Sequence, residues 1–170
     1  TTFPQKQKDA IPLAIAFPNT YSIGMCSLGF QTAWKLFNQN ENVRAIRWFT
    51  DIQEKTNSIP DYIGFSFSWE LDYKNIFYIL EKNNIPLYSK DRGENDPLIF
   101  AGGQVPNANP EPFCDNFDFF LIGDLEEIAH EFISKIIETK DLTRSDKLEV
   151  LSKLAGVYIP GKDAINRVST

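Results

Sequence analysis

Short apolar runs alternate along this chain with amphipathic segments of helical period, and this alternation constrains the fold more than any other feature. Residues 12–18 form such a run between Pro12 and Pro18, which predicts a buried strand of a parallel sheet. Four further strands are expected over residues 43–49, 62–68, 98–101 and 117–122, and amphipathic helices over 23–37, 70–83 and 125–137. A last helix over residues 145–155 and a short strand-like run over 157–160 complete the pattern.

Strands that alternate with helices imply right-handed crossovers between parallel strands. We therefore predict an α/β fold with a doubly wound, mostly parallel five-stranded sheet. In such sheets ligands bind outside the carboxyl ends of the strands. The residues that follow each expected strand are therefore the candidate site.

Composition and charge exclude several functions. The chain has 170 residues and a net charge of −6, and its 17 Lys and Arg residues are scattered, so no direct nucleic-acid binding is expected. No apolar stretch reaches the roughly 20 residues of a membrane helix, and no secretory signal is visible. Cys26, Cys114 and His130 cannot by themselves complete a zinc site or hold an iron–sulfur cluster, so no metal site is predicted. The low cysteine content favours a cytoplasmic protein.

Polar residues follow the first and third expected strands. Asn and Ser side chains can form hydrogen bonds or cap helices, and a glycine lets the backbone approach a ligand closely. A capped turn is the simpler interpretation of the first loop taken alone. After the third strand, Ser66 and Ser68 lie on the same side because side chains alternate along a strand. Ser68 can cap the next helix while Ser66 faces a ligand. The candidate residues of the first loop are Asn19, Thr20, Tyr21, Ser22 and Gly24.

The fourth and fifth expected strands end at glycines. Gly102-Gly103-Gln104 follows the fourth strand, and its bare backbone serves either a tight turn or a large ligand lying across the sheet edge. Gly123-Asp124 follows the fifth strand, and the acids just after it repel phosphate. No Gly-x-x-x-x-Gly-Lys-Ser/Thr or Gly-x-Gly-x-x-Gly motif is present, so neither a nucleotide triphosphatase nor an ordinary NAD domain is expected.

Four other residues are weaker candidates. Cys26 falls on the apolar face of the first expected helix, which predicts a place in the core. His130 has no evident partner and is expected to be solvated or packed. Cys114 lies in a loop, where a reactive thiol has no supporting feature. Trp69 comes just after the third strand and is the tryptophan with the best position to meet a ligand.

The run from Phe17 to Gln31 resembles the start of cobalamin-binding-type radical SAM proteins, whose N-terminal domain often opens with Pro-x-x-Tyr-x-x-Gly-Met-Ser-x-Leu-Gly. Further stretches resemble the same domain, namely residues 63–68, 99–103, 110–112, 118–127 and 156–160. The resemblance covers about residues 11–160. It implies a flavodoxin-like, cobalamin-binding-type Rossmann fold, with the nucleotide tail of the corrinoid entering the crevice at the strand ends.

One position departs from the classical pattern. Classical members carry Asp-x-His-x-x-Gly in the first loop, and the His ligates cobalt; the matching positions here are Asn19, Tyr21 and Gly24. Tyr21 cannot serve as an imidazole ligand. The resemblance therefore implies either a cobalamin held without a protein nitrogen ligand or a domain that has lost cobalamin binding.

The resemblance also implies a missing partner domain. Radical SAM barrels use Cys-x-x-x-Cys-x-x-Cys to ligate a 4Fe–4S cluster and bind S-adenosylmethionine, and this chain lacks the motif. Residues 11–160 are thus expected to form the cobalamin-binding-like domain, and 161–170 a linker toward a radical SAM domain of the same chain. The absent start Met agrees with a fragment, which by itself should have no turnover, whereas the parent chain would be a radical SAM enzyme.

Two functions remain open. In the first, the domain presents cobalamin to the barrel. In the second, it is a degenerate module without cofactor that docks the barrel or positions its substrate. A flavin domain is a third and weaker idea, because the fifth-strand loop is acidic and no Ser/Thr-rich phosphate loop is present.

Overall fold

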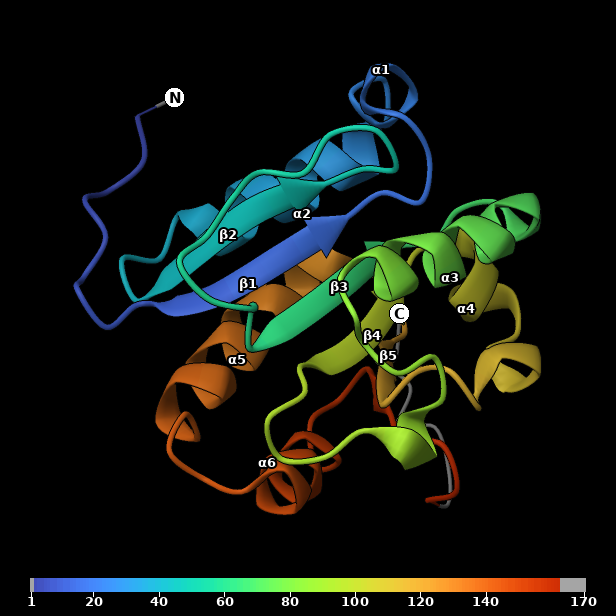
Figure 1. Cartoon of the computed structure of the whole chain (residues 1–170). Helices are drawn as coiled ribbons and strands as arrows, with labels where there is room; N and C mark the ends of the chain where they lie inside the picture. Colours follow the sequence, from blue (N-terminus) through green and yellow to red (C-terminus); the bar gives the residue numbers. More distant parts are fainter. Residues whose placement is uncertain (1, 163–170) are drawn as a thin grey trace.

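The centre of the structure is a twisted, mostly parallel sheet. A computed structural model of the chain describes residues 2–162, and within them the sheet has six strands in the order β2-β1-β3-β4-β5-β6 (Figure 1). All neighbouring strands are parallel except β5 and β6, which are antiparallel. The predicted doubly wound sheet is therefore confirmed. The strands are β1 (Ile11–Ala16), β2 (Val43–Trp48), β3 (Tyr62–Ser66), β4 (Leu98–Gly102), β5 (Phe119–Leu121) and β6 (Val157–Tyr158).

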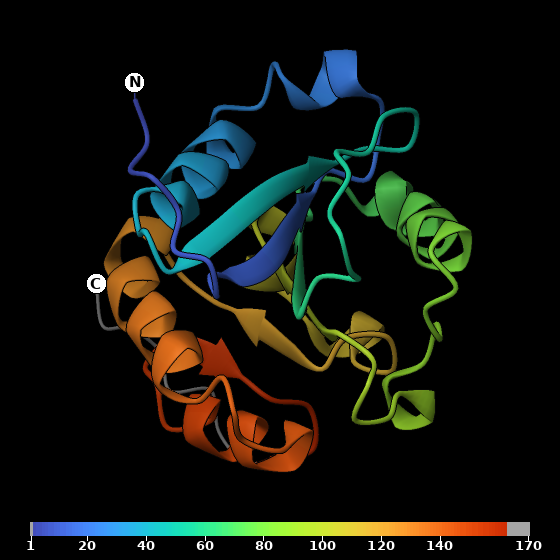
Figure 2. The ribbon, with the colours of Figure 1, turned by 60° about the vertical axis from the view of Figure 1, so that its left-hand side comes forward.

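The sequences of the inner strands β1, β3, β4 and β5 are apolar on both faces because helices cover both sides of the sheet, whereas the edge strand β2 contains Arg44 and Arg47. Leu13 and Ile15 of β1 belong to one hydrophobic cluster, and Ala14 and Ala16 of the same strand belong to the other. The first cluster contains the apolar faces of α2 and α5, and the second contains those of α3 and α4. Figure 2 shows the sheet with α2 and α5 on one side and α3 on the other. The helices are α1 (Tyr21–Gly24), α2 (Leu28–Asn38), α3 (Tyr73–Lys82), α4 (Gln104–Ala108), α5 (Leu125–Glu138) and α6 (Arg144–Leu151).

The expected first helix is divided in two. The chain leaves helical conformation after Gly24 and enters α2 at Leu28, where the Ser27 hydroxyl caps the new helix by accepting a hydrogen bond from the Phe30 N–H at 3.3 Å. Cys26 lies in the break and is exposed, so its predicted place in the core is wrong. The apolar period predicted one continuous helix, but the Ser27 cap begins a new helix at Leu28 instead.

Two further segments differ from expectation. The strand-like run at 157–160 joins the sheet, because Val157 and Tyr158 pair antiparallel with Leu121 and Phe120 and add a sixth strand. No helix was expected between the strands at 98–101 and 117–122, but this stretch forms α4 and a 3-10 turn at Glu111–Phe113. Most of the expected linker, residues 163–170, lies outside the described residues.

An ion group is buried between the amino-terminal ends of the strands and α6. The Asp118 carboxylate accepts from the Arg92 guanidinium at 3.0 Å and pairs with that of Arg144 at 2.7 Å. The Arg92 side chain is completely buried. Asp118 also accepts a hydrogen bond from the Ile99 N–H at 2.7 Å, so one carboxylate joins β4, the loop before β5 and α6.

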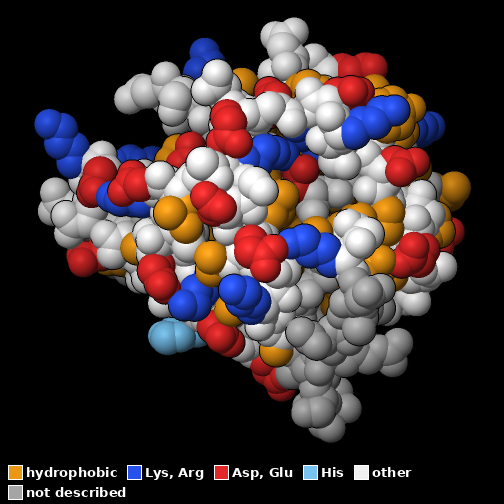
Figure 3. Space-filling view, turned by 90° about the horizontal axis from the view of Figure 1, so that it is seen from below, with side chains coloured by type: hydrophobic (Ala, Val, Ile, Leu, Met, Phe, Trp, Pro, Cys, Tyr) orange, Lys and Arg blue, Asp and Glu red, His pale blue; other side chains and the backbone are white. Residues whose placement is uncertain are grey.

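The outer surface mixes both signs of charge. On the face shown in Figure 3, acidic and basic side chains are interspersed. Among residues 2–162, no helix combines the length and the apolar character needed to cross a membrane.

Candidate functional site

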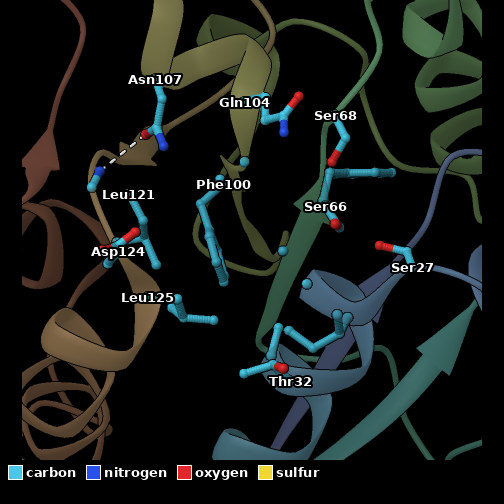
Figure 4. Close-up of a pocket in the computed structure, with 18 of the residues that line it drawn as sticks. Ser27, Thr32, Ser66, Ser68, Phe100, Gln104, Asn107, Leu121, Asp124 and Leu125 are labelled. Atoms are coloured by element: carbon cyan, nitrogen blue, oxygen red, sulfur yellow. Dashed lines mark hydrogen bonds between the residues drawn. The ribbon is translucent and has the colours of Figure 1, made fainter.

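A groove of about 430 Å³ opens at the carboxyl ends of β3, β4 and β5, between α2 and α5. It borders the place between β1 and β3 where the strand order reverses, which is where doubly wound sheets bind ligands. Figure 4 shows Asn107, Asp124 and Leu125 on one side of the groove and Ser27, Ser66 and Ser68 on the other, with Phe100 between them.

An aromatic ring forms the floor of this groove. The Phe100 ring stacks on Phe119, with 5.0 Å between ring centroids and 11° between planes. Its β3 neighbour is Gly64, and a Cβ atom built on Gly64 would lie only 2.3 Å from the Phe100 ring. Gly64 therefore leaves space for the ring to lie across β3, and the floor is flat and apolar.

Hydroxyl groups of β3, the loop after it and α2 also line the groove. Ser66 and Ser68 both contribute to it, as their alternation along the strand predicts. Ser68 does not cap a helix: the 3-10 turn Glu70–Asp72 begins after Trp69 and has no side-chain cap, and α3 has none either. Both serines are therefore available to a ligand. Thr32 of α2 also lines the groove, and sequence reasoning missed it.

The two adjacent glycines after β4 serve different purposes. Gly103 has a φ of +114°, and a Cβ atom there would lie 2.9 Å from the Phe67 carbonyl oxygen, so the tight turn itself requires glycine. Gly102 has no such requirement, because a Cβ atom there would make only ordinary contacts, the nearest at 3.5 Å. The bare backbone of Gly102 lines the groove, together with Gly103 and Gln104.

The loop after β5 forms the acidic side of the groove. Gly123 has a φ of +112° and donates its N–H to the Asn107 side-chain oxygen at 3.0 Å. Asp124 precedes α5 without capping it, and Asp124 and Glu126 line the groove. Their negative charge disfavours a phosphate at this side. Asn107 lies in α4, a helix that was not expected from the sequence, so sequence reasoning missed its contribution.

The loop after β1 lies at the same edge of the sheet but does not line the groove. The Asn19 side-chain amide donates to the Asp72 carboxylate at 3.0 Å, which joins this loop to the one after β3. The Tyr21 ring packs on Phe49 with centroids 5.1 Å apart. A Cβ atom on Gly24 would lie 2.5 Å from the Phe49 ring, so packing already explains that glycine. The hydroxyls of Thr20 and Ser22 are 3.2 Å apart. A ligand role for these residues stays a prediction.

The weaker candidates lie outside this groove. Burial, with the nearby Glu111 carboxylate, raises the pKa of the Cys114 thiol and so favours its unreactive form. His130 is exposed on α5. It lines a second groove, which lies between α5 and the carboxyl-terminal end of α2. Trp69 is 61% exposed at the sheet edge. Within residues 2–162, no three or more His, Cys, Asp or Glu side chains are grouped so that they could hold a metal ion.

Fold and groove together define a flavodoxin-like, doubly wound α/β domain with an open groove at the carboxyl edge of its sheet. Residues 53–160 match the family model described as the N-terminal region of radical SAM proteins, and the chain belongs to this family. The matched region contains β3 to β6 and begins after the Asn19–Gly24 loop, so it does not bear on that loop. The comparisons with curated proteins and with solved structures gave no match.

Proposed function

We propose that the groove receives the nucleotide tail of a cobalamin and that the domain presents this corrinoid to a radical SAM domain of the same chain. The observation that carries the proposal is the groove itself, which opens at the switch point of the sheet over a flat apolar floor. Its volume of about 430 Å³ lies within the range of small-molecule sites. Cobalamin, when bound, supplies radical chemistry.

The lining residues fit the planar base of such a tail. The Phe100 ring, stacked on Phe119 and only 3% exposed, gives an apolar floor for the base, and the hydroxyls of Ser66 and Thr32 offer hydrogen bonds beside it. The backbone of Gly102 allows close approach, because a side chain there would project into the groove. Asp124 and Glu126 would direct the phosphate of the tail away from their side of the groove.

No imidazole of this chain is available to cobalt at the groove. His130 is the single histidine of the sequence, and it lines the second groove between α5 and the carboxyl-terminal end of α2. Tyr21, which stands where classical members have the ligand, packs on Phe49. We therefore propose a cobalamin without a protein nitrogen ligand.

The second candidate is a degenerate module that holds no cofactor. Two observations favour it: the loop after β1 does not line the groove, and two carboxylates do. In this case the domain would dock the barrel or position its substrate. A binding measurement separates the two functions.

Substitution of Gly29 by Leu should weaken cobalamin binding without harming the fold. Gly29 lines the groove on α2, and a Cβ atom there meets nothing within 4 Å. Leucine is also the better helix former, by about 0.5–1 kcal/mol. In titrations with hydroxocobalamin followed by absorbance and calorimetry, we expect the variant to bind about tenfold more weakly or worse, a loss of ~1.4 kcal/mol or more.

Gly93→Leu is the matched control, because a Cβ atom on Gly93 also meets nothing within 4 Å and Gly93 lies outside the groove. It should bind like the unsubstituted chain. The titrations are made on the 170-residue chain and on the longer chain that includes the radical SAM domain, which could shield the corrin from water. Absence of binding to both chains would establish the degenerate module, and equal binding by the Gly29 and Gly93 variants would place the ligand elsewhere.

The reading frame is expected to continue beyond residue 170 into a domain that contains Cys-x-x-x-Cys-x-x-Cys. The reason is membership of a family that forms the N-terminal region of radical SAM proteins. Sequencing the locus checks this directly. A stop codon immediately after residue 170 would contradict it.

A further inference from the structure

Exposed apolar side chains gather at one edge of the molecule. Among residues 2–162, ten large hydrophobic side chains are exposed, and six of them lie in the segments 21–28, 51–52 and 69–71, which come soon after the carboxyl ends of β1, β2 and β3. The most exposed are Leu28 at 79%, Leu71 at 67% and Trp69 at 61%. We call these six residues the edge surface: Tyr21, Ile23, Leu28, Ile52, Trp69 and Leu71.

Hydrogen bonds connect the loops after β1, β2 and β3, so the edge surface is a preformed unit. The Asn19 side chain joins the first loop to Asp72 in the third at 3.0 Å. The Asp51 carboxylate accepts from the Tyr21 N–H at 2.8 Å, and the Thr50 N–H donates to the Asn19 carbonyl at 3.0 Å, which joins the first loop to the second. In Figures 1 and 2, α1 lies beside the turn after β2.

We infer that the edge surface is the docking site of the radical SAM domain that follows in the same chain. The family of this chain forms the N-terminal region of such proteins, so a domain of that kind is the expected neighbour. The edge surface is also continuous with the mouth of the groove: Leu28 stands between the lining residues Ser27 and Gly29, and Trp69 follows the lining residue Ser68. A domain seated there would cover the groove from above.

The side chains of the edge surface indicate which kind of partner surface would bind there. Trp is among the residues that dominate interface energies when buried at the centre of a contact. Asp51, Glu70 and Asp124 are exposed beside the segments of the edge surface, and Lys74 and Lys82 are the nearby bases, the latter donating to the Thr50 carbonyl at 3.4 Å. The partner face is therefore apolar at its centre with Lys and Arg at its rim. The same acidic rim disfavours an anionic lipid surface.

This inference rests on the domain order of the proposed function but not on cobalamin. Oxidative footprinting with mass spectrometry tests it by comparing the 170-residue chain with the full-length protein, both without cobalamin. Trp69 should react about fivefold more slowly in the full-length protein, because an interface would bury a side chain that is now 61% exposed. Tyr88, which is 49% exposed outside the edge surface, should react at the same rate in both chains.

A double variant tests the cause of the protection. In the full-length protein, Trp69→Ser with Leu71→Ser should return the reactivity of Leu28 to its rate in the 170-residue chain, although Leu28 lies in a different segment. Tyr88→Ser is the matched control and should leave Leu28 protected. Exposed substitutions of this kind seldom harm the fold, and circular dichroism verifies it.

Four results would overturn the inference. They are equal Trp69 reactivity in the two chains, Leu28 protection that survives the double variant, protection of the 170-residue chain that grows with its concentration, and protection that requires added cobalamin. The third would identify a second copy as the occupant, and the fourth the cofactor. Failure of the cobalamin titration together with protected Trp69 would reject the cofactor and keep the docking site, so the two proposals fail separately.

Discussion

Replacing Asp118 by Ala is expected to destabilise the domain by about 3–5 kcal/mol, the usual cost of removing one partner of a buried ion pair. The carboxylate pairs with Arg92 at 3.0 Å and Arg144 at 2.7 Å, and the Arg92 side chain has no exposure to solvent. Burial lowers the pKa of the Arg92 guanidinium, and Asp118 opposes that shift. Without Asp118, a buried cation would lose the group that compensates its desolvation.

Urea or thermal denaturation measures this loss. The stability of Asp118→Asn should fall between that of the unsubstituted chain and that of Asp118→Ala. The Asn side chain removes the charge but keeps an oxygen that can accept from the Ile99 N–H. Asp9→Ala is the matched control: Asp9 also pairs with a cation, Lys140 at 2.6 Å, but the pair is exposed to solvent and its loss should leave the unfolding midpoint unchanged. Equal effects at Asp118 and Asp9 would show that burial does not determine how much these ion pairs contribute to the free energy of unfolding.

Substitution of Gly103 by Val is expected to destabilise the fold by about 2–4 kcal/mol, through backbone strain and overpacking. The φ of +114° is unfavourable for any residue with a Cβ atom, and that atom would lie 2.9 Å from a backbone oxygen of Phe67, which cannot move aside as a side chain can. Lost ligand binding in this variant would therefore report a damaged fold. Gly103→Val would be a clean probe of binding only if Gly103 had an ordinary φ, and it does not.

The neighbouring glycine provides the control. Gly102→Ala places its new methyl group 3.5 Å from the nearest atom, so the same denaturation experiment should show little change in stability. It should nevertheless weaken cobalamin binding, because Gly102 lines the groove. If Gly103→Val unfolds at the same denaturant concentration as the unsubstituted chain, the turn does not require glycine at position 103 and the prediction is wrong.

Local patterns in the sequence were sufficient for the architecture. The apolar runs at β1, β3, β4 and β5 and the regular apolar period of α5 identify a doubly wound α/β sheet, because burial on both faces leaves a direct signature in composition and spacing. The same reasoning placed Ser66, Gly102 and Asp124 at strand ends, and all three line the groove. Each of these features depends only on the segment that contains the residue, so the local sequence is sufficient to predict it.

Only the tertiary structure decided which strand-end residues meet. The contact between Asn107 and Gly123 joins two loops, and the Asp118 ion group gathers residues from three parts of the chain. The requirement for glycine at 103 comes from the Phe67 backbone, and the place of the loop after β1 outside the groove comes from its packing on Phe49. Each of these depends on a distance between segments far apart in sequence, which local periodicity does not encode.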